Sequence, residues 1–250
     1  MAPIITIRDV KKSLAGAPVL KGISLNFEEG AVSSIIGQSG SGKSVLAKHL
    51  IGIMKPDEGD VFFKGRSIAG ADEGELVEIR RHFGYSFQGA ALFDSLTVRE
   101  NIAFPVREVL KITDRGRIDE LVKEQLAWIG LPGIEEKLPA ELSGGMRKRV
   151  GVARALVTKP EVLLFDEPTT GLDPVLGETI NDLVSRVNRE LGLTCILITH
   201  DIQATFRISD RIALLHDGVI AAAGTPRNVS RSAHQMVQKF ISNSFNSLDV

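Results

Sequence analysis

Residues 37–44, Gly-Gln-Ser-Gly-Ser-Gly-Lys-Ser, have the types and the spacing that bind the phosphates of a nucleotide. They match G-x-x-x-x-G-K-[ST], in which glycines allow successive backbone amides to point at phosphate oxygens. Residues 31–36 predict a buried strand before the loop, and residues 45–51 predict a helix after it, whose N-terminal dipole favours an anion. An incidental glycine-rich turn is the alternative, and it leaves this strand–loop–helix context unexplained. The predicted nucleotide-binding residues here are Gly37, Gln38, Ser39, Gly40, Ser41, Gly42, Lys43 and Ser44.

Two acidic residues later in the chain supply the carboxylates that such a site needs. Residues 162–165 are an unbroken apolar run, typical of a central parallel strand, and Asp166 and Glu167 follow directly. Because ligands bind at the carboxyl ends of strands in open α/β sheets, we expect both side chains beside the phosphate loop. There the Ser44 hydroxyl suits Mg²⁺, Asp166 suits its outer ligand sphere, and Glu167 is placed to accept a proton from an attacking water. A helix cap before Pro168 is the alternative for the acidic pair.

The segment 142–146, Leu-Ser-Gly-Gly-Met, lies between these two motifs and precedes a helical stretch. Ser143 has the residue type of a helix N-cap, and the two glycines leave the helix end open to a phosphate, although a flexible cap alone would have the same sequence. Together the three motifs resemble the ATP-binding cassette (ABC) ATPases, whose signature is LSGGQ. The resemblance implies that two subunits enclose two ATP molecules, each covered by the signature of the other subunit. The signature residues are Leu142, Ser143, Gly144, Gly145 and Met146.

Three further segments match the family pattern in the expected order. Gln88 matches a glutamine that contacts Mg²⁺ and senses the membrane partner. Gly171, Leu172 and Asp173 match a loop that crosses to the opposite subunit, although Asp173 before a proline is also typical of a helix N-cap. His200, after the apolar run 194–199, matches a histidine that contacts the γ-phosphate, whereas a lone histidine at a strand end is more often a cap.

The resemblance covers the chain from residue 4 to about 226 and implies the chemistry of the site. It implies ATP and Mg²⁺ as cofactors and an ATP-hydrolysing enzyme. The catalytic residues implied are Lys43, Glu167 and His200, and the residues implied near the metal are Ser44, Gln88 and Asp166. A nucleotide-binding scaffold without turnover is the alternative, and it would be expected to lack Glu167 or His200.

Two positions depart from the usual cassette pattern. Leu14 stands where the family carries an aromatic residue that stacks on adenine, so base affinity and the choice of base are open. Met146 replaces the signature glutamine. LSGGM followed by Arg147, Lys148 and Arg149 resembles the ATPases of Mla-type phospholipid transporters and of the related mycobacterial lipid and steroid importers. The alternative is an importer of another solute in which Met146 is a tolerated change.

The composition limits the class of protein. The chain has 250 residues and a net charge of −1, which does not favour nucleic-acid binding. Its one cysteine, Cys195, lies in an apolar run, which favours a reducing compartment. Neither a run of roughly 18 apolar residues nor a secretory signal is present. We therefore expect a peripheral protein at the cytoplasmic face of the inner or plasma membrane, with the transport path formed by other chains.

The pattern of the whole chain predicts an α/β P-loop NTPase fold of the ABC type. We expect a mixed core sheet, an antiparallel β edge and a helical subdomain. One ABC ATPase domain would span residues 1–250. Its core lobe would comprise about 1–88 and 159–226, its helical signature lobe about 89–158, and its C-terminal tail helix 227–250. Met236, Val237, Phe240 and Ile241 would place an apolar face on that tail, packed on its own domain or on a second subunit.

The partners expected from the resemblance are a second identical subunit, integral-membrane permease subunits and a substrate-binding lipid-carrier protein. The permease would dock near residues 88–98, where Leu92 and Phe93 are expected to be exposed. A soluble cassette ATPase of DNA repair, translation or iron–sulfur assembly is the competing class. The repair type carries a long coiled coil and the translation type two cassettes in one chain, and the sequence has neither.

Overall fold

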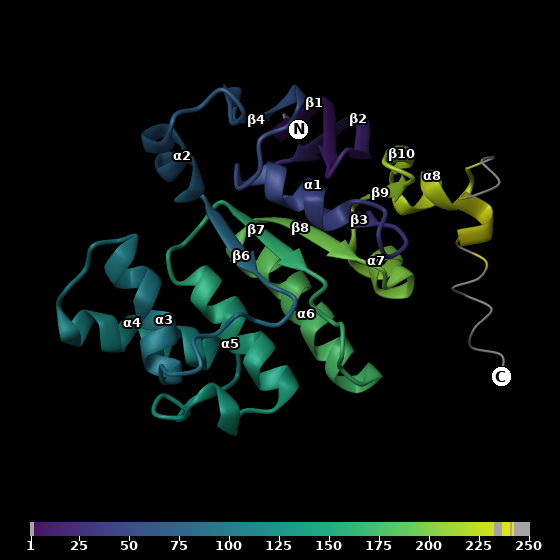
Figure 1. Cartoon of the computed structure of the whole chain (residues 1–250). Helices are drawn as coiled ribbons and strands as arrows, with labels where there is room; N and C mark the ends of the chain where they lie inside the picture. Colours follow the sequence, from purple (N-terminus) through teal and green to yellow (C-terminus); the bar gives the residue numbers. More distant parts are fainter. Residues whose placement is uncertain (1–2, 233–236, 241, 243–250) are drawn as a thin grey trace.

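The computed structural model describes residues 3–232, 237–240 and 242, and its strands form two sheets (Figure 1). The first sheet is antiparallel and consists, in order, of β2 (Ala17–Glu28), β1 (Pro3–Leu14), β4 (Glu58–Phe63) and β5 (Arg66–Ser67). The second consists, in order, of β10 (Val219–Gly224), β9 (Arg211–His216), β3 (Val32–Ile36), β8 (Thr194–Thr199), β7 (Val162–Asp166) and β6 (Phe83–Ser86). The strands from β9 to β6 pair in parallel, and β10 pairs antiparallel with β9. The predicted α/β fold with a mixed sheet and antiparallel strands is confirmed.

The helices lie in two groups. One group accompanies the second sheet or the strands beside it and includes α1 (Lys43–Leu50), α6 (Pro174–Leu191), α7 (Ile202–Ile208) and α8 (Pro226–Ser230). The others are α2 (Glu73–Arg80), α3 (Val98–Glu108), α4 (Arg115–Trp128), a short 3₁₀ turn (Pro139–Glu141) and α5 (Gly144–Leu156). Figure 1 shows α3, α4 and α5 gathered in teal beside the sheet, with α5 next to α6. These three helices are called the helical lobe below.

Local sequence explains where the helices begin and end. Thr97 accepts a hydrogen bond from the backbone N–H of Glu100, whose side chain accepts one from Thr97 in return, so α3 starts at a complete capping box. Asp173 accepts from the N–H of Leu176 at the start of α6, as its residue type and the following proline indicate. The same helix ends at Gly192, whose φ of 68° is left-handed.

Burial explains why the central strands pair as they do. Val162, Leu163, Leu164 and Phe165 of β7 are each fully buried, as expected of a parallel strand that helices cover on both faces. Alternate side chains of this strand enter two different cores, one shared with the helical lobe and one with the first sheet. The strand that carries the acidic pair is therefore held from both sides.

The described part of the C-terminal region packs on its own chain. Val237 is fully buried, and Phe240 packs in the same apolar cluster, which includes Ile212, Leu214 and Val229. Met236 and Ile241, which the sequence placed on the same apolar face, lie outside the described residues. Among the described residues, no helix combines the length and the apolar character needed to cross a bilayer.

Candidate active site

The carboxyl ends of the parallel strands bring the chemically important residues to one edge of the second sheet. Ile36 of β3 pairs with Thr199 of β8, and Asp166 of β7 pairs with Ile198 of β8, so the segments that follow these strands emerge side by side. They enclose a cavity of about 540 Å³. The cavity is lined by Val19, Ser39, Gly40, Gly42, Lys43, Ser44, Val45, Gln88, Glu167, Thr170 and His200.

The loop 37–44 has the backbone form that its glycines predict. Gly40 and Gly42 have φ angles of 81° and 103°, which residues other than glycine rarely adopt. Gly42 is the N-cap of α1, and no side chain caps this helix end, so its N–H groups are open to an anion. The Nζ of Lys43 donates to the carbonyls of Gly37 and Gln38, at 2.8 and 3.1 Å. Burial lowers the pKa of Lys43, and the charge of Glu167 opposes that shift.

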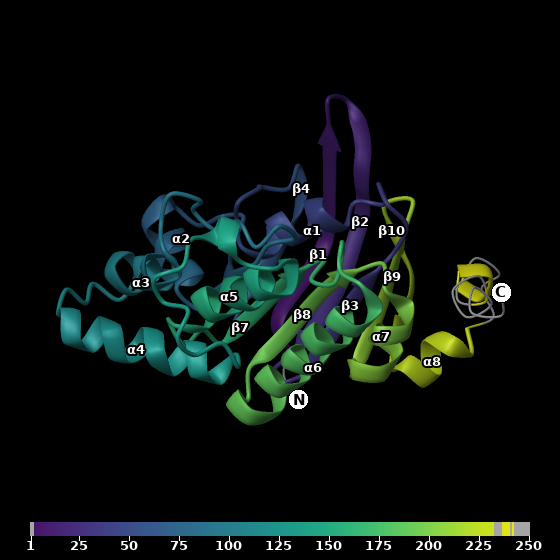
Figure 2. The same ribbon diagram turned by 90° about the horizontal axis from the view of Figure 1, so that it is seen from below.

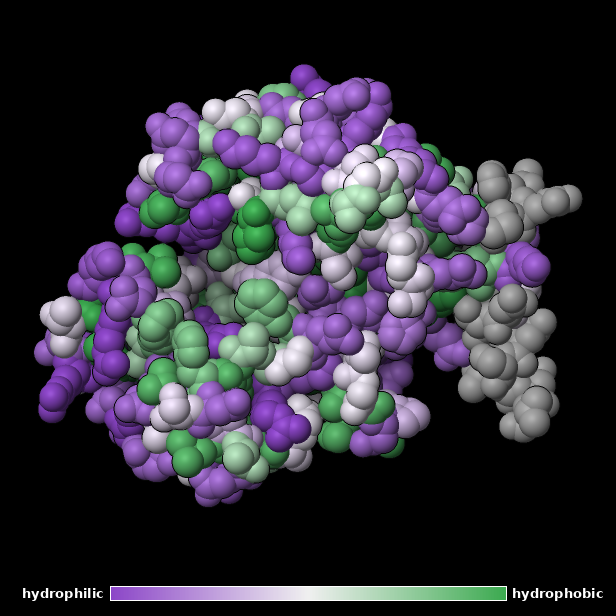
Figure 3. All heavy atoms as spheres, in the orientation of Figure 1, coloured by the Kyte–Doolittle hydropathy of each residue, from purple (hydrophilic) through white to green (hydrophobic). Residues whose placement is uncertain are grey.

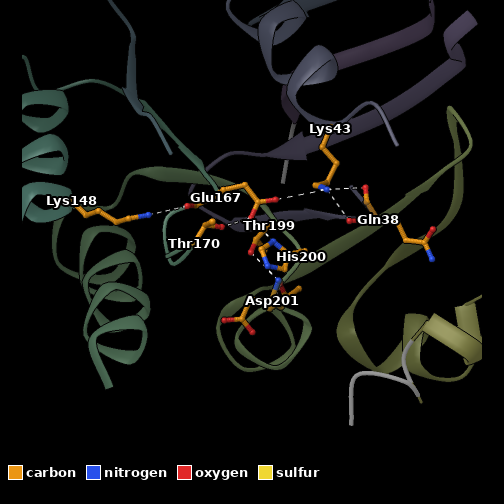
Figure 4. A network of polar contacts seen from close by, with 10 residues as sticks. Gln38, Lys43, Lys148, Glu167, Thr170, Thr199, His200 and Asp201 are labelled. Atoms are coloured by element: carbon orange, nitrogen blue, oxygen red, sulfur yellow. Dashed lines mark hydrogen bonds and ion pairs between the residues drawn. The ribbon is translucent and has the colours of Figure 1, made fainter. Parts of the chain in front are cut away.

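Glu167 is at the centre of a network of polar contacts (Figure 4). Its Oε2 lies 2.7 Å from the Nδ1 of His200 and accepts a hydrogen bond from the hydroxyl of Thr170 at 3.1 Å. Its Oε1 lies 3.8 Å from the Nζ of Lys43. Glu167 thus contacts both of the other predicted catalytic residues, Lys43 and His200, which come from segments far apart in the chain. The carboxylate faces the side chains that would meet the γ-phosphate.

Asp166 lies beside this network and has a free oxygen. Its Oδ2 accepts a hydrogen bond from the hydroxyl of Tyr85 at 2.9 Å, and its buried Oδ1 has no partner among the described residues. Burial raises the pKa of Asp166, and the hydrogen bond from Tyr85 opposes that shift. Ser44 and Gln88 line the adjoining cavity and offer a hydroxyl and an amide oxygen. These are the hard oxygen donors that Mg²⁺ prefers, so the residues present fit that metal.

The signature segment lies outside this cavity. Ser143 is the N-cap of α5 and accepts a hydrogen bond from the N–H of Met146 at 3.3 Å. A Cβ atom on Gly144 or Gly145 would lie 3.4 Å from Leu172 or Leu176, so the signature and the loop 171–173 are neighbours in one chain. Neither segment contributes to the cavity wall described above. Met146 packs against the core of the helical lobe.

The hairpin of β1 and β2 places Leu14 at its tip. Leu14 pairs with Ala17 across the turn and is 38% exposed, and Figure 2 shows the hairpin projecting beyond the rest of the chain. Val19, which lies on β2 two residues after Ala17, lines the cavity next to the phosphate loop. Apolar cover at this end of the site therefore comes from Val19, which the sequence interpretation did not single out.

Two more residues of the network escaped the sequence interpretation. Thr170 lies three residues after Glu167, the spacing at which a turn returns a side chain to its neighbour, so its role had a local signal. Lys148 had none. It lies in α5, and its Nζ donates to the backbone carbonyl of Glu167 at 3.2 Å.

Comparison with known families identifies the chain. Residues 20–170 match the family model described as ABC transporter. The chain belongs to the ABC transporter family. As a member it is an ATP-binding cassette, and its ATPase activity is coupled to transport.

Several curated ABC relatives are similar over most of the chain. Protein TRIGALACTOSYLDIACYLGLYCEROL 3 of Arabidopsis thaliana chloroplasts is 40% identical over 96% of this chain and 74% of its own length. The probable ribonucleotide transport ATP-binding protein mkl of Mycobacterium tuberculosis is 37% identical over 96% of this chain and 67% of its own. The methionine import ATP-binding protein MetN of Brucella abortus is 40% identical over 89% of this chain and 60% of its own.

Solved ABC cassettes share the fold. A dimeric ATP-binding cassette in a post-hydrolysis state, bound to ADP and Pi, matches with a TM-score of 0.80 and 34% identity over 89% of this chain and 99% of that one. The cbiO1 protein of Clostridium perfringens, part of the transporter complex cbiONQ, matches with a TM-score of 0.85 and 29% identity over the whole of both chains. The predicted family and fold are therefore confirmed.

Proposed function

We propose that this cassette dimerises around two ATP molecules and uses their hydrolysis to drive lipid transport by separate permease subunits. The observation that carries the proposal is the single cavity in which Lys43, Glu167 and His200 meet while the signature lies outside it. The cavity contains the catalytic carboxylate but no signature residue. A second copy of the chain would supply the signature that completes the ATP site.

The residues of the cavity divide the chemistry among them. The amides of the phosphate loop and the Nζ of Lys43 bind the β- and γ-phosphates, and Lys43 and His200 stabilise the charge that develops as the γ-phosphoryl group leaves. Glu167 orients the attacking water and accepts its proton. Ser44, Gln88 and Asp166 would hold Mg²⁺, which neutralises phosphate charge when bound. Glu167 must leave the Nζ of Lys43 when a nucleotide enters, because both groups face the same phosphate.

The dimer rests on the signature and on the loop that follows the acidic pair. Ser143, the N-cap of α5, is placed to contact the γ-phosphate bound by the second copy. Gly171, Leu172 and Asp173 lie beside it and would cross the same interface. The similarity to a dimeric cassette bound to ADP and Pi supports this assembly. Hydrolysis would remove the phosphate that joins the two copies, so the copies would part.

A groove on the other side of Gln88 is the proposed docking site of the permease. It encloses about 520 Å³ between α2, β6 and the helical lobe, and Figure 3 shows hydrophobic residues on both sides of this hollow. Phe93 and Phe104 line it and are each 43% exposed, with ring centroids 5.0 Å apart. Leu92, in contrast, packs against the core of the helical lobe, so only one of the two expected apolar residues faces the groove. The residues that line the groove include four basic ones and one acidic one, so a permease helix with an acidic residue fits it. The basic residues are Arg80, Arg81, Lys111 and Arg154, and the acidic one is Glu108.

The lipid cargo is supported by the sequence of the signature and by one relative. The name of the Arabidopsis relative refers to a galactolipid, and its 40% identity extends over 96% of this chain. A lipid-carrier protein in the same complex and a position at the cytoplasmic face of the membrane belong to the same proposal. MetN, also 40% identical, supports the second candidate, a cassette of an importer for a small solute such as methionine.

The test is to purify the cassette together with its membrane partners and to reconstitute the complex in phospholipid vesicles. Lipid transport predicts ATP-dependent movement of a fluorescent phospholipid and an ATPase rate that rises with phospholipid and not with methionine. The Glu167→Gln complex is the matched control, since it should assemble but not transport. Stimulation by methionine alone would favour the second candidate. A cassette that never co-purifies with a membrane protein would refute the proposed assembly with permease subunits.

A further inference from the structure

A buried lysine connects the signature helix to the backbone of Glu167 in the same chain. Lys148 is 9% exposed, although lysine is among the residues least often buried. Its Nζ lies 3.2 Å from the backbone carbonyl oxygen of Glu167. Lys148 belongs to the helical lobe, and Glu167 directly follows β7. Figure 4 shows Lys148 reaching Glu167 from the side opposite Lys43. Burying an ammonium group costs free energy, so this position calls for an explanation beyond packing.

The backbone that Lys148 contacts is strained. Glu167 has φ of 49°, in the left-handed region, which costs a residue other than glycine roughly 1–2 kcal/mol. Three hydrogen bonds to its backbone groups hold it there. The N–H of Glu167 donates to the carbonyl of Ile198 at 2.7 Å, and its carbonyl accepts from the Nζ of Lys148 at 3.2 Å and from the N–H of Thr170 at 3.3 Å. This conformation turns the Glu167 carboxylate toward Thr170 and His200, and of the three bonds only the one from Lys148 comes from the helical lobe.

Lys148 and Ser143 belong to one rigid element. Ser143 caps α5, and Lys148 follows about 7.5 Å along the same helix at 1.5 Å per residue. If the N-terminus of α5 moves, Lys148 therefore moves with it by the same amount. The helix also packs against α3, α6 and β6, which adjoin the groove and the loop 171–173.

We propose that Lys148 is a positioning residue that links the signature helix to Glu167, so that engagement of Ser143 on the partner's nucleotide adjusts the carboxylate in its own site. The inference rests on the proposed role of Glu167 as the group that positions water. Through Lys148, closure of one composite site changes the position of the Glu167 carboxylate in the other site. Docking of a permease helix beside α5 would act on Glu167 by the same bond.

The test compares Lys148→Met, which keeps the length and removes the donor, with Lys148→Arg, which keeps a charged donor. We expect Lys148→Met to lower kcat by about tenfold, the loss typical of one hydrogen bond to a charged group, with KM for ATP within twofold of the parent. Lys148→Arg should recover most of kcat. Lys123→Met is the control, since Lys123 is an exposed lysine of α4 in the same lobe. It should leave both constants unchanged.

A double-mutant cycle separates positioning from general support of the fold. In the Glu167→Gln background, Lys148→Met should lower the single-turnover rate by less than twofold, because the group it positions is already gone. A full tenfold loss in that background, or an unchanged kcat in the single variant, would overturn the inference. If Lys148→Met melts below the assay temperature, Lys148→Gln replaces it, since its shorter side chain draws the donor away from the carbonyl while remaining polar. Glu167→Gln with normal turnover would instead overturn the proposed function.

Discussion

Removal of the Phe93 ring should separate the stability of the cassette from its association with the membrane. Phe93 is 43% exposed, so Phe93→Ala takes away a little more than half of the apolar burial that a fully enclosed phenylalanine contributes. Full burial is worth about 1.5–3 kcal/mol, so the expected loss of unfolding free energy is about 1–2 kcal/mol. For a chain of this size, that corresponds to a melting temperature lower by roughly 2–8 °C. The cassette should remain folded and hydrolyse ATP.

The expected effect on association is larger. A partly exposed aromatic ring at the middle of an apolar groove is the kind of residue that contributes 2 kcal/mol or more to an interface. Loss of about 2 kcal/mol weakens binding of the permease about thirtyfold. Leu191→Ala is the matched control, because Leu191 is 45% exposed at the end of α6 and lies outside the groove. It should lower the melting temperature slightly and leave association unchanged.

Thermal melting and co-purification from detergent-solubilised membranes check this prediction together. The reasoning fails if Phe93→Ala co-purifies with the permease as well as the parent does. It fails in the opposite way if the melting temperature falls by much more than 8 °C, because the ring would then support the helical lobe rather than face a partner.

Three further predictions concern the nucleotide. Glu167→Gln should retain ATP binding and reduce steady-state phosphate release by at least about 10²-fold, the loss typical of a positioned proton acceptor; near-normal release would assign the water to another residue. Ser143→Arg should leave ATP binding to the isolated subunit intact and abolish the ATP-dependent dimerisation of the Glu167→Gln protein, measured by sedimentation; a persisting dimer would contradict the composite site. Leu14→Tyr should tighten ATP binding, measured by titration calorimetry, by up to about tenfold if stacking on adenine adds about 1.4 kcal/mol. An unchanged affinity for ATP would indicate that Val19 alone covers the base.

The sequence was most informative where a few neighbouring residues decide a local conformation. The loop 37–44 could be predicted because its glycines permit the left-handed backbone that Gly40 and Gly42 adopt. The N-caps at Ser143 and Asp173 could be predicted because a short polar side chain satisfies backbone N–H groups two or three residues away. Unbroken apolar runs were sufficient to predict β7 and β8 as central strands.

The rule that ligands bind at the carboxyl ends of parallel strands was enough to expect the acidic pair beside the phosphate loop. Most other contacts between distant segments could be expected only through the family resemblance, and those of Lys148 and Val19 not even then. The meeting of Lys43, Glu167 and His200 follows from the order in which β3, β8 and β7 pair, which no residue type encodes by itself. Leu92 and Phe93 are adjacent and similarly apolar, yet one packs inward and the other faces the groove. That choice depends on the direction in which the chain enters the helical lobe.

The amino-acid sequence by itself determined the chemistry of this protein: a phosphate loop, an acidic pair, a signature and a histidine, each readable from neighbours along the chain. The tertiary structure decided the placement of Val19 beside the phosphate loop and the bond from Lys148 to the carbonyl of Glu167. The physical reason is that a side chain specifies what it can bind but not which partner it meets. A lysine donates equally well to any carbonyl, and only the packing of α5 against the end of β7 selects this one.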